Sequence, residues 1–182
     1  MTEPDAHEPC SGTDDAWKAL SLVNDWIRHA DTKVGVTLAT SGAVGVMLYN
    51  LVNALSKHGS GCAYIAPLGC ALLLLLTVFF CASALNPRIN PADSVADPET
   101  LKVPSHLYFG VISTHWKREQ YVREFNELMV NPDALVREIA SQVHVNAQIA
   151  SDKMAATKRA IWMLTSAVGA LAVTALVVLI QG

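Results

Sequence analysis

Charge is scarce in this chain, and it is missing altogether from three long stretches. Charged residues make up 16% of the sequence, and none of them lies in 34–56, 62–85 or 160–180. Each stretch exceeds the roughly 20 helical residues that cross the hydrocarbon core of a bilayer. A helix in a soluble core seldom stays uncharged on every face over such a length. The sequence therefore predicts three membrane-spanning helices.

The lack of other features excludes further classes of protein. The net charge of −3 argues against a basic nucleic-acid-binding surface. The four cysteines show no CxxC spacing and lie mostly in the second apolar stretch, so we expect neither a disulfide framework nor a metal site. No phosphate-binding loop, GxSxG motif or HExxH motif is present. We therefore expect a non-catalytic protein that needs no metal or cofactor.

The distribution of Lys and Arg predicts the orientation. Three of these residues precede the first span, one lies between the first two spans, and nine lie between the second and third. The positive-inside rule then places the start of the chain and the region 86–159 in the cytoplasm. The acidic, polar start of the chain has no basic n-region, so we expect no cleaved signal peptide.

Outside the spans, the pattern predicts helices separated by turns. We expect a disordered leader at 1–13 and an amphipathic cytoplasmic helix at 14–33 that continues into the first span. The segment 106–114 is aromatic and β-branched, but a single strand would have no partner, so a docked loop is expected. A helix over 116–130 should end before Pro132, which begins the last helix.

The last helix carries a predicted contact seam that continues into the third span. Its small and apolar residues alternate in steps of four and three, as in coiled coils: Val136, Ala140, Val143, Ala147, Ala150, Met154, Thr157 and Ile161. The expected fold is an all-α membrane protein, with three transmembrane helices and a cytoplasmic helical bundle continuous with the first and third spans. Three spans are few for an aqueous pathway, so we expect a homo-oligomer.

The most pointed local feature is Asp31, just before the first span. An acidic residue beside the cytoplasmic membrane surface gains nothing from anionic lipids, so Asp31 should have a partner. Lys153 and Arg159, at the corresponding place on the last helix, are the candidates. Arg28 and Lys33 have an ordinary role as membrane-edge anchors. For Asp31, a structural pairing and a ligand-binding role both fit.

These features, taken in order, resemble the transmembrane effectors of Pycsar antiphage systems. The resemblance covers roughly residues 17 to 180, and it rests on three groups of residues: Asn24-Asp25-Trp26-Ile27-Arg28 with Ala30-Asp31-Thr32-Lys33, then Tyr108-Phe109-Gly110 followed by Tyr121, then Asn146 to Lys153. It implies an effector in the bacterial inner membrane that senses a cyclic pyrimidine nucleotide, cUMP or cCMP, made by a partner cyclase. The effector would then impair the lipid bilayer and cause abortive infection.

A site for such a ligand needs a cation for the phosphodiester and a flat platform for the base. The candidate binding or switch residues are Arg28, Asp31, Lys33, Phe109, Tyr121, Lys153 and Arg159, with Tyr108 and Trp116 as further stacking residues. Both cUMP and cCMP satisfy these requirements, and membrane impairment by a pore or by general disruption fits equally. The alternative function is a non-catalytic membrane scaffold or an accessory subunit of a membrane complex.

Overall fold

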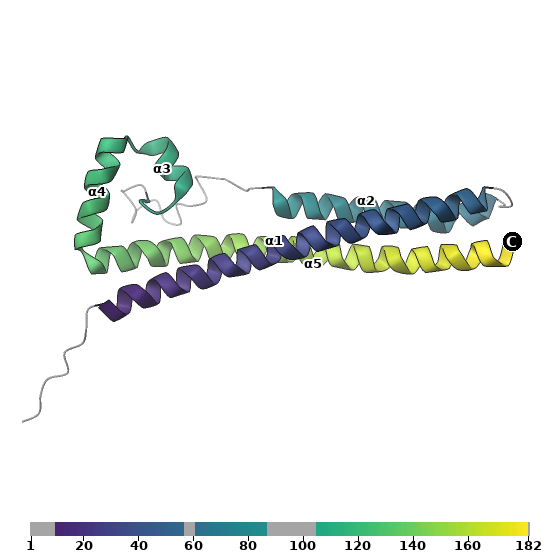
Figure 1. Ribbon diagram of the computed structural model, residues 1–182, viewed down its shortest axis with the longest axis horizontal. Helices are drawn as coiled ribbons and strands as arrows, with labels where there is room; N and C mark the ends of the chain where they lie inside the picture. The colour runs from purple at the N-terminus through teal and green to yellow at the C-terminus, as the bar shows by residue number, and fades with distance from the viewer. Residues whose placement is uncertain (1–9, 57–60, 87–104, 182) are drawn as a thin grey trace, which may run out of the picture. The chain divides into compact units, whose positions relative to one another are not determined.

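The computed structural model describes residues 10–56, 61–86 and 105–181. These residues form helices and no strand: α1 (Cys10–Leu55), the short 3-10 helix η1 (Gly61–Tyr64), α2 (Ile65–Leu85), α3 (Phe109–His115), α4 (Arg118–Val130) and α5 (Pro132–Gln181) (Figure 1). The prediction of an all-α protein is confirmed. Residues 1–9 of the expected leader lie outside the described part, and α1 begins at Cys10, before the expected start of the helix.

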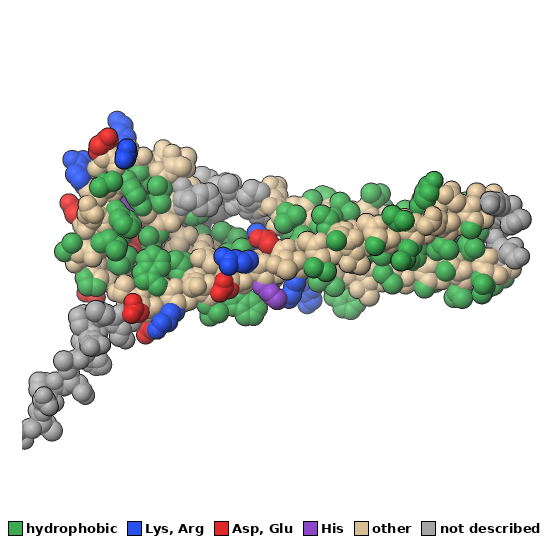
Figure 2. All heavy atoms as spheres, viewed as in Figure 1, with side chains coloured by type: hydrophobic (Ala, Val, Ile, Leu, Met, Phe, Trp, Pro, Cys, Tyr) green, Lys and Arg blue, Asp and Glu red, His purple; other side chains and the backbone are tan. Residues whose placement is uncertain are grey.

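Three of the helices contain stretches that are long and apolar enough to cross a membrane. They are Gly12–Leu55, Ile65–Leu85 and Pro132–Ile180. No charged residue lies in 61–86 or 160–181, and the visible surface of α2 is correspondingly covered by hydrophobic side chains (Figure 2). By length and composition, the three predicted spans are confirmed.

The chain folds into two compact units. Unit 1 consists of Met1–Ile27 and Arg88–Ala150, and unit 2 consists of Arg28–Pro87 and Ser151–Gly182. Helices α1 and α5 each contribute their first part to unit 1 and their second part to unit 2. The uncharged stretches 34–56, 62–85 and 160–180 therefore belong to unit 2, and α3 and α4 belong to unit 1.

The three helices of unit 2 bury residues in steps of three, four or seven. These residues are Val34, Thr37, Ser41, Val44, Leu48 and Leu55 on α1; Pro67, Cys70, Leu74, Thr77, Cys81 and Ala84 on α2; and Thr157, Ala160, Ala167 and Thr174 on α5. Such a seven-residue repeat is typical of left-handed helix packing. Most of the buried residues are small, which lets the backbones approach closely in a membrane. The Cys70 Sγ accordingly reaches the Ala167 carbonyl oxygen at 3.2 Å.

The buried hydroxyl groups of unit 2 bond to their own helices. Thr77 donates to the Leu73 carbonyl at 2.8 Å, and Thr174 donates to the Ala170 carbonyl at 2.9 Å. A hydroxyl that is satisfied within its own helix can be buried in the membrane without a polar partner on another helix. These residues therefore serve as small contact residues.

The contact face of α5 differs from the predicted seam. Ala140, Ala147 and Ile161 are exposed, whereas Leu135, Ile139, Gln142 and Ala160 are buried, together with the predicted Ala150 and Thr157. The prediction was right at Ala150 and Thr157, but each of the other buried residues named here lies one position before a predicted one, as with Ile139 in place of Ala140. The reason is that polar residues such as Gln142 belong to the buried face, so a count of apolar residues alone misplaces it.

Unit 1 has its own small apolar core. Leu20 of α1 packs with Leu135 and Ile139 of α5, and the half-buried residues around them are Ala16, Leu107, Leu128 and Val143. This core joins the start of α1, the segment before α3, the end of α4 and the start of α5. It fixes the surroundings of the polar and aromatic residues described below.

The segment 109–115 is a helix, so the predicted docked loop was wrong there. The Tyr108 carbonyl accepts the first bonds of α3, from the N–H groups of Val111 at 3.1 Å and Ile112 at 3.0 Å. The hydroxyls of Ser113 and Thr114 both donate to the Gly110 carbonyl, at 3.0 and 2.7 Å. Local hydrogen bonds of this kind outweigh the strand preference of a β-branched run.

Candidate functional site

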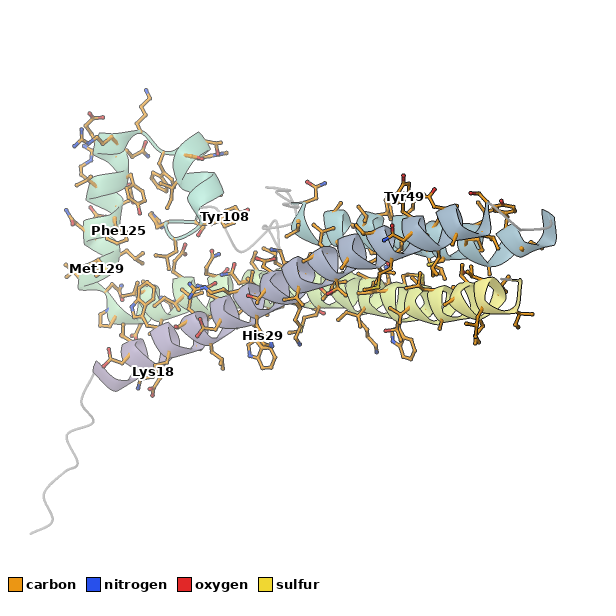
Figure 3. The ribbon with its side chains drawn as sticks, turned by 45° about the vertical axis from the view of Figure 1, so that its right-hand side comes forward. Lys18, His29, Tyr49, Tyr108, Phe125 and Met129 are labelled. Carbon is orange, nitrogen blue, oxygen red and sulfur yellow. The ribbon has the colours of Figure 1, made fainter. Side chains whose placement is uncertain are left out.

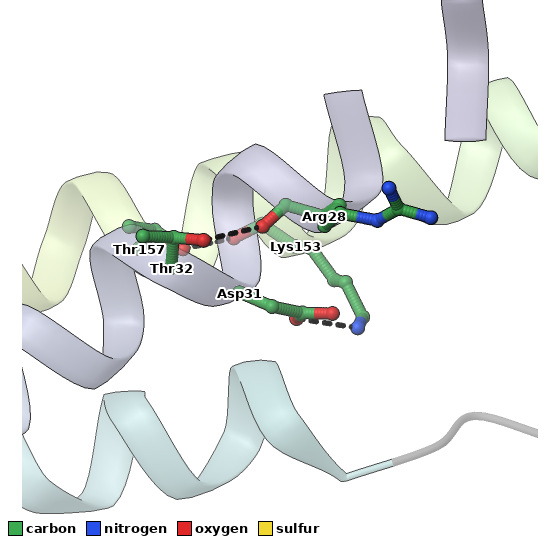
Figure 4. A network of polar contacts seen from close by, with 5 residues as sticks. All are labelled: Arg28, Asp31, Thr32, Lys153 and Thr157. Carbon is green, nitrogen blue, oxygen red and sulfur yellow. Dashed lines mark hydrogen bonds and ion pairs between the residues drawn. The ribbon is translucent and has the colours of Figure 1, made fainter. Parts of the chain in front are cut away.

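An ion pair joins α1 and α5 in unit 2. The Lys153 Nζ lies 2.6 Å from Asp31 Oδ1, and the two side chains are 20% and 39% exposed, respectively (Figure 4). The two residues are 122 positions apart in the sequence. The expectation that Asp31 has a partner is confirmed, and Lys153 is that partner. Partial burial makes this pair stronger than an ordinary surface pair, because water screens it less.

Small residues around the pair let the two helices approach. Ala30 and Val34 are buried on either side of Asp31, and Ala160 is buried in the same cluster as Val34. The Thr157 hydroxyl donates to the Lys153 carbonyl at 2.7 Å, and the Thr32 hydroxyl donates to the Arg28 carbonyl at 3.0 Å. The pair is therefore the charged contact within an otherwise small and apolar helix interface.

The other cationic candidates of unit 2 are exposed. Arg28, Lys33 and Arg159 all have exposed side chains, and Figure 4 shows the Arg28 guanidinium extending away from the Asp31–Lys153 pair. Exposed cations near the end of a span are typical membrane-edge anchors. Among the described residues, Lys153 is thus the predicted cation that forms an ion pair with Asp31.

In unit 1, the segment before α3 is held by hydrogen bonds. Glu138 Oε1 accepts from the Ser105 hydroxyl at 2.7 Å and from the His106 N–H at 2.8 Å. The Tyr121 hydroxyl donates to the His106 carbonyl at 3.0 Å, and the Trp116 indole N–H donates to the Ser105 carbonyl at 3.4 Å. Residues of α4 and α5 therefore fix the position of His106 from two sides.

Four aromatic side chains form a cluster in the same place. The His106 and Trp116 rings lie 4.7 Å apart, Trp116 and Tyr121 meet edge to face at 6.3 Å, and Tyr121 stacks on Phe125 at 5.6 Å. Figure 3 shows Phe125 on α4 and Tyr108 beside α3. Tyr121 and Trp116, both predicted as stacking residues, belong to this cluster. Phe109, another aromatic candidate, begins α3.

Sequence reasoning missed the roles of Ser105, His106 and Glu138. Glu138 lies on a helix face among ordinary surface acids in the sequence, and only the fold brings it to the Ser105 hydroxyl. A second missed feature is a chain of amides, in which Gln142 donates to Asn146 at 2.9 Å and Asn146 donates to Asn24 at 2.9 Å. A polar residue at a contact position of a seven-residue repeat is the signal that could have revealed it.

The described part of the chain contains no group of three or more His, Cys, Asp or Glu residues that could hold a metal ion. The chemical features described above are the Asp31–Lys153 ion pair in unit 2 and the aromatic cluster in unit 1. Neither arrangement forms the nucleophile–base pair that covalent catalysis needs. Both arrangements suit binding and conformational switching.

Comparison with known proteins identifies the class. Residues 15–181 match the family model described as "Pycsar effector protein domain" (PycTM). The Pycsar effector protein PtPycTM of Propioniciclava tarda is 34% identical over 176 residues, which cover 94% of this chain and 80% of that protein. No solved structure matches the chain significantly. The chain is a helical membrane protein of antiviral defence, and it belongs to the Pycsar effector family.

Proposed function

We propose that this protein is a bacterial inner-membrane effector that senses a cyclic pyrimidine nucleotide, cUMP or cCMP, and then impairs the membrane. The ligand would come from a partner cyclase during phage infection, and the outcome would be abortive infection. The observation that carries the proposal is the family match over 15–181, which includes the three uncharged stretches and most of both compact units. In this proposal the protein is non-catalytic and acts as a homo-oligomer.

The two long helices supply a route from binding to the membrane. Helices α1 and α5 each run as one helix through residues of both units. Ligand binding that tilts a helix in unit 1 would therefore move the same helix in unit 2, because a helix transmits rigid-body displacement along its axis. The many lysines and arginines of 86–159 support a cytoplasmic location for unit 1, where the nucleotide would be made.

The Asp31–Lys153 pair is well suited to hold the resting state. It joins α1 to α5 among small residues that offer little interlocking of their own. A bistable interface of this type changes state when one charged contact is lost or exchanged. In this proposal, the ligand-driven tilt breaks the pair and frees the spans to rearrange.

Binding can be tested on the detergent-solubilised protein. A ligand that binds only the folded state stabilises it by about 2.7 kcal/mol at a concentration of 100 Kd. We expect cUMP or cCMP to raise the unfolding temperature, and cAMP at the same concentration to raise it less. The absence of a shift with both pyrimidine nucleotides at millimolar concentration would refute ligand sensing and favour a membrane scaffold.

A further inference from the structure

Unit 1 contains a buried polar atom that the rest of the protein leaves unsatisfied. His106 is 8% exposed, and its Nε2 has no hydrogen-bond partner among the described residues. A neutral imidazole carries one donor and one acceptor nitrogen, and buried polar atoms nearly always have a partner. The backbone N–H and carbonyl of the same residue are both bonded. The backbone of His106 is thus fixed in place, while the Nε2 atom of its side chain is available to accept or donate a hydrogen bond.

The imidazole is covered by a ring that is weakly held. Trp116 stacks on His106 at 4.7 Å with an angle of 35° between the rings. Its indole N–H donates to the Ser105 carbonyl at 3.4 Å, which is longer than the usual range of about 2.7–3.2 Å for N–H···O bonds. The Trp116 side chain is also only half-buried. A ligand that reaches Nε2 would need this ring to shift from its contacts with His106 and Tyr121.

Cationic groups follow Trp116 directly. Lys117 is the N-cap residue of α4 and makes no side-chain capping bond. Lys117 and Arg118 are both exposed. The N-terminus of a helix attracts anions through its free N–H groups and its dipole, and two adjacent cations add to this attraction. A ligand that carries both an anionic group and an aromatic ring could therefore place the anion at Lys117 and Arg118 and the ring against Trp116.

We propose that the cyclic nucleotide binds here, in unit 1. The base stacks on the Trp116 and Tyr121 rings and hydrogen-bonds to His106 Nε2, and the phosphodiester lies at the N-terminus of α4 beside Lys117 and Arg118. Either pyrimidine base offers an N–H group that can donate to this nitrogen, so the site accommodates cUMP and cCMP. This inference rests on the proposed function, because it names the residues that bind the proposed ligand.

The test measures nucleotide affinity by calorimetry on full-length protein in detergent. His106→Phe keeps the ring and removes the unsatisfied nitrogen, so the fold should be retained while affinity for cUMP or cCMP falls about tenfold, the effect of one lost hydrogen bond. The double variant Lys117→Gln/Arg118→Gln should also weaken binding about tenfold and reduce its salt dependence. Arg123→Gln removes a charge from the same helix and serves as the matched control, with affinity expected within about twofold of wild type.

Fluorescence provides a measurement that does not depend on the His106 variant folding. Replacing Trp17, Trp26 and Trp162 by Phe leaves Trp116 as the only tryptophan, and its emission should change on addition of the nucleotide. Wild-type affinity in the His106 and Lys117/Arg118 variants, or an unchanged Trp116 emission while the wild type binds, would overturn this site and leave the proposed function intact. If the wild type binds neither nucleotide, the proposed function and the site both fall.

Discussion

The Asp31–Lys153 pair allows the sharpest test of how unit 2 is held together. Its Nζ–Oδ1 distance is 2.6 Å, and its side chains are 20% and 39% exposed. Exposed pairs contribute about 0.2 to 1 kcal/mol, whereas removing one partner of a fully buried pair costs about 3 to 5 kcal/mol. Because Asp31 is more than a third exposed, solvent screening places this pair near the lower range. We expect a coupling energy of about 1 kcal/mol, the upper end of the range for exposed pairs.

A double-mutant cycle measures that coupling directly. Asp31→Asn, Lys153→Met and the double variant would be compared by their free energies of unfolding in detergent. Each single variant leaves one charge without its partner, and the double variant removes both charges. A coupling energy below about 0.3 kcal/mol would show that the pair does not hold α1 against α5.

The same variants test the role of the pair in signalling. If the pair holds the resting state, Asp31→Asn should depolarise cells without any nucleotide. The exchanged pair Asp31→Lys/Lys153→Asp should restore a quiet state, because the opposite charges again face each other. Cells that stay polarised with either single variant, at wild-type expression, would contradict the proposed lock.

The Asp15–Lys18 pair of unit 1 is the matched control for the cycle. Its N–O distance is 2.9 Å, but its side chains are 67% and 76% exposed, so we expect a weaker coupling than for Asp31–Lys153. The hydrogen bond that Lys18 donates to Asp15, and then the negative charge of Asp15, raise the pKa of Lys18. A raised pKa means that any stabilisation by this pair is present below the ordinary lysine pKa and is lost as pH rises through the folded-state pKa. Asp15→Asn should return the Lys18 pKa towards its ordinary value in an NMR titration.

Three further predictions concern orientation and packing. A reporter fused after Gly182 should be external and one inserted within 90–100 cytoplasmic, and the opposite pattern would place the sensor on the wrong side of the membrane. Ala147→Glu should change the free energy of unfolding by about 0.5 kcal/mol or less, because Ala147 is exposed. Ala150→Glu should lower the free energy of unfolding by several kcal/mol, because Ala150 is buried. Equal effects of the two substitutions would refute the observed contact face. A Cβ on Gly110 would meet Tyr108 Cε1 at 2.8 Å, so Gly110→Ala in the wild-type protein introduces a clash. In a Tyr108→Ala background the clash is absent, and Gly110→Ala should raise the stability by about 1 kcal/mol through its higher helix propensity. Thermal unfolding of the variants measures the difference.

The sequence by itself determined the large elements. The absence of charge from 34–56, 62–85 and 160–180 dictates spans, because the bilayer core does not solvate charge. The start of the last helix was predicted from Asn131-Pro132, and α5 does begin at Pro132. The reason lies within this segment, because a proline ring fits only the first turn of a helix. Asp31 was also predicted to have a partner, and Lys153 was one of the two candidates named. Each of these predictions depends on the chemistry of residues in a single segment.

Only the tertiary structure decided which side chains meet. The contact face of α5 includes Gln142, and the position of that face is set by neighbouring helices rather than by apolar residues alone. The His106 cluster joins the segment before α3 to residues of α4, and Glu138 of α5 fixes it. Such contacts depend on how segments distant in sequence pack, and no local pattern encodes the distance between two side chains on different helices. The candidate base-binding nitrogen was therefore hidden in the sequence, because its lack of a partner is a property of the folded protein.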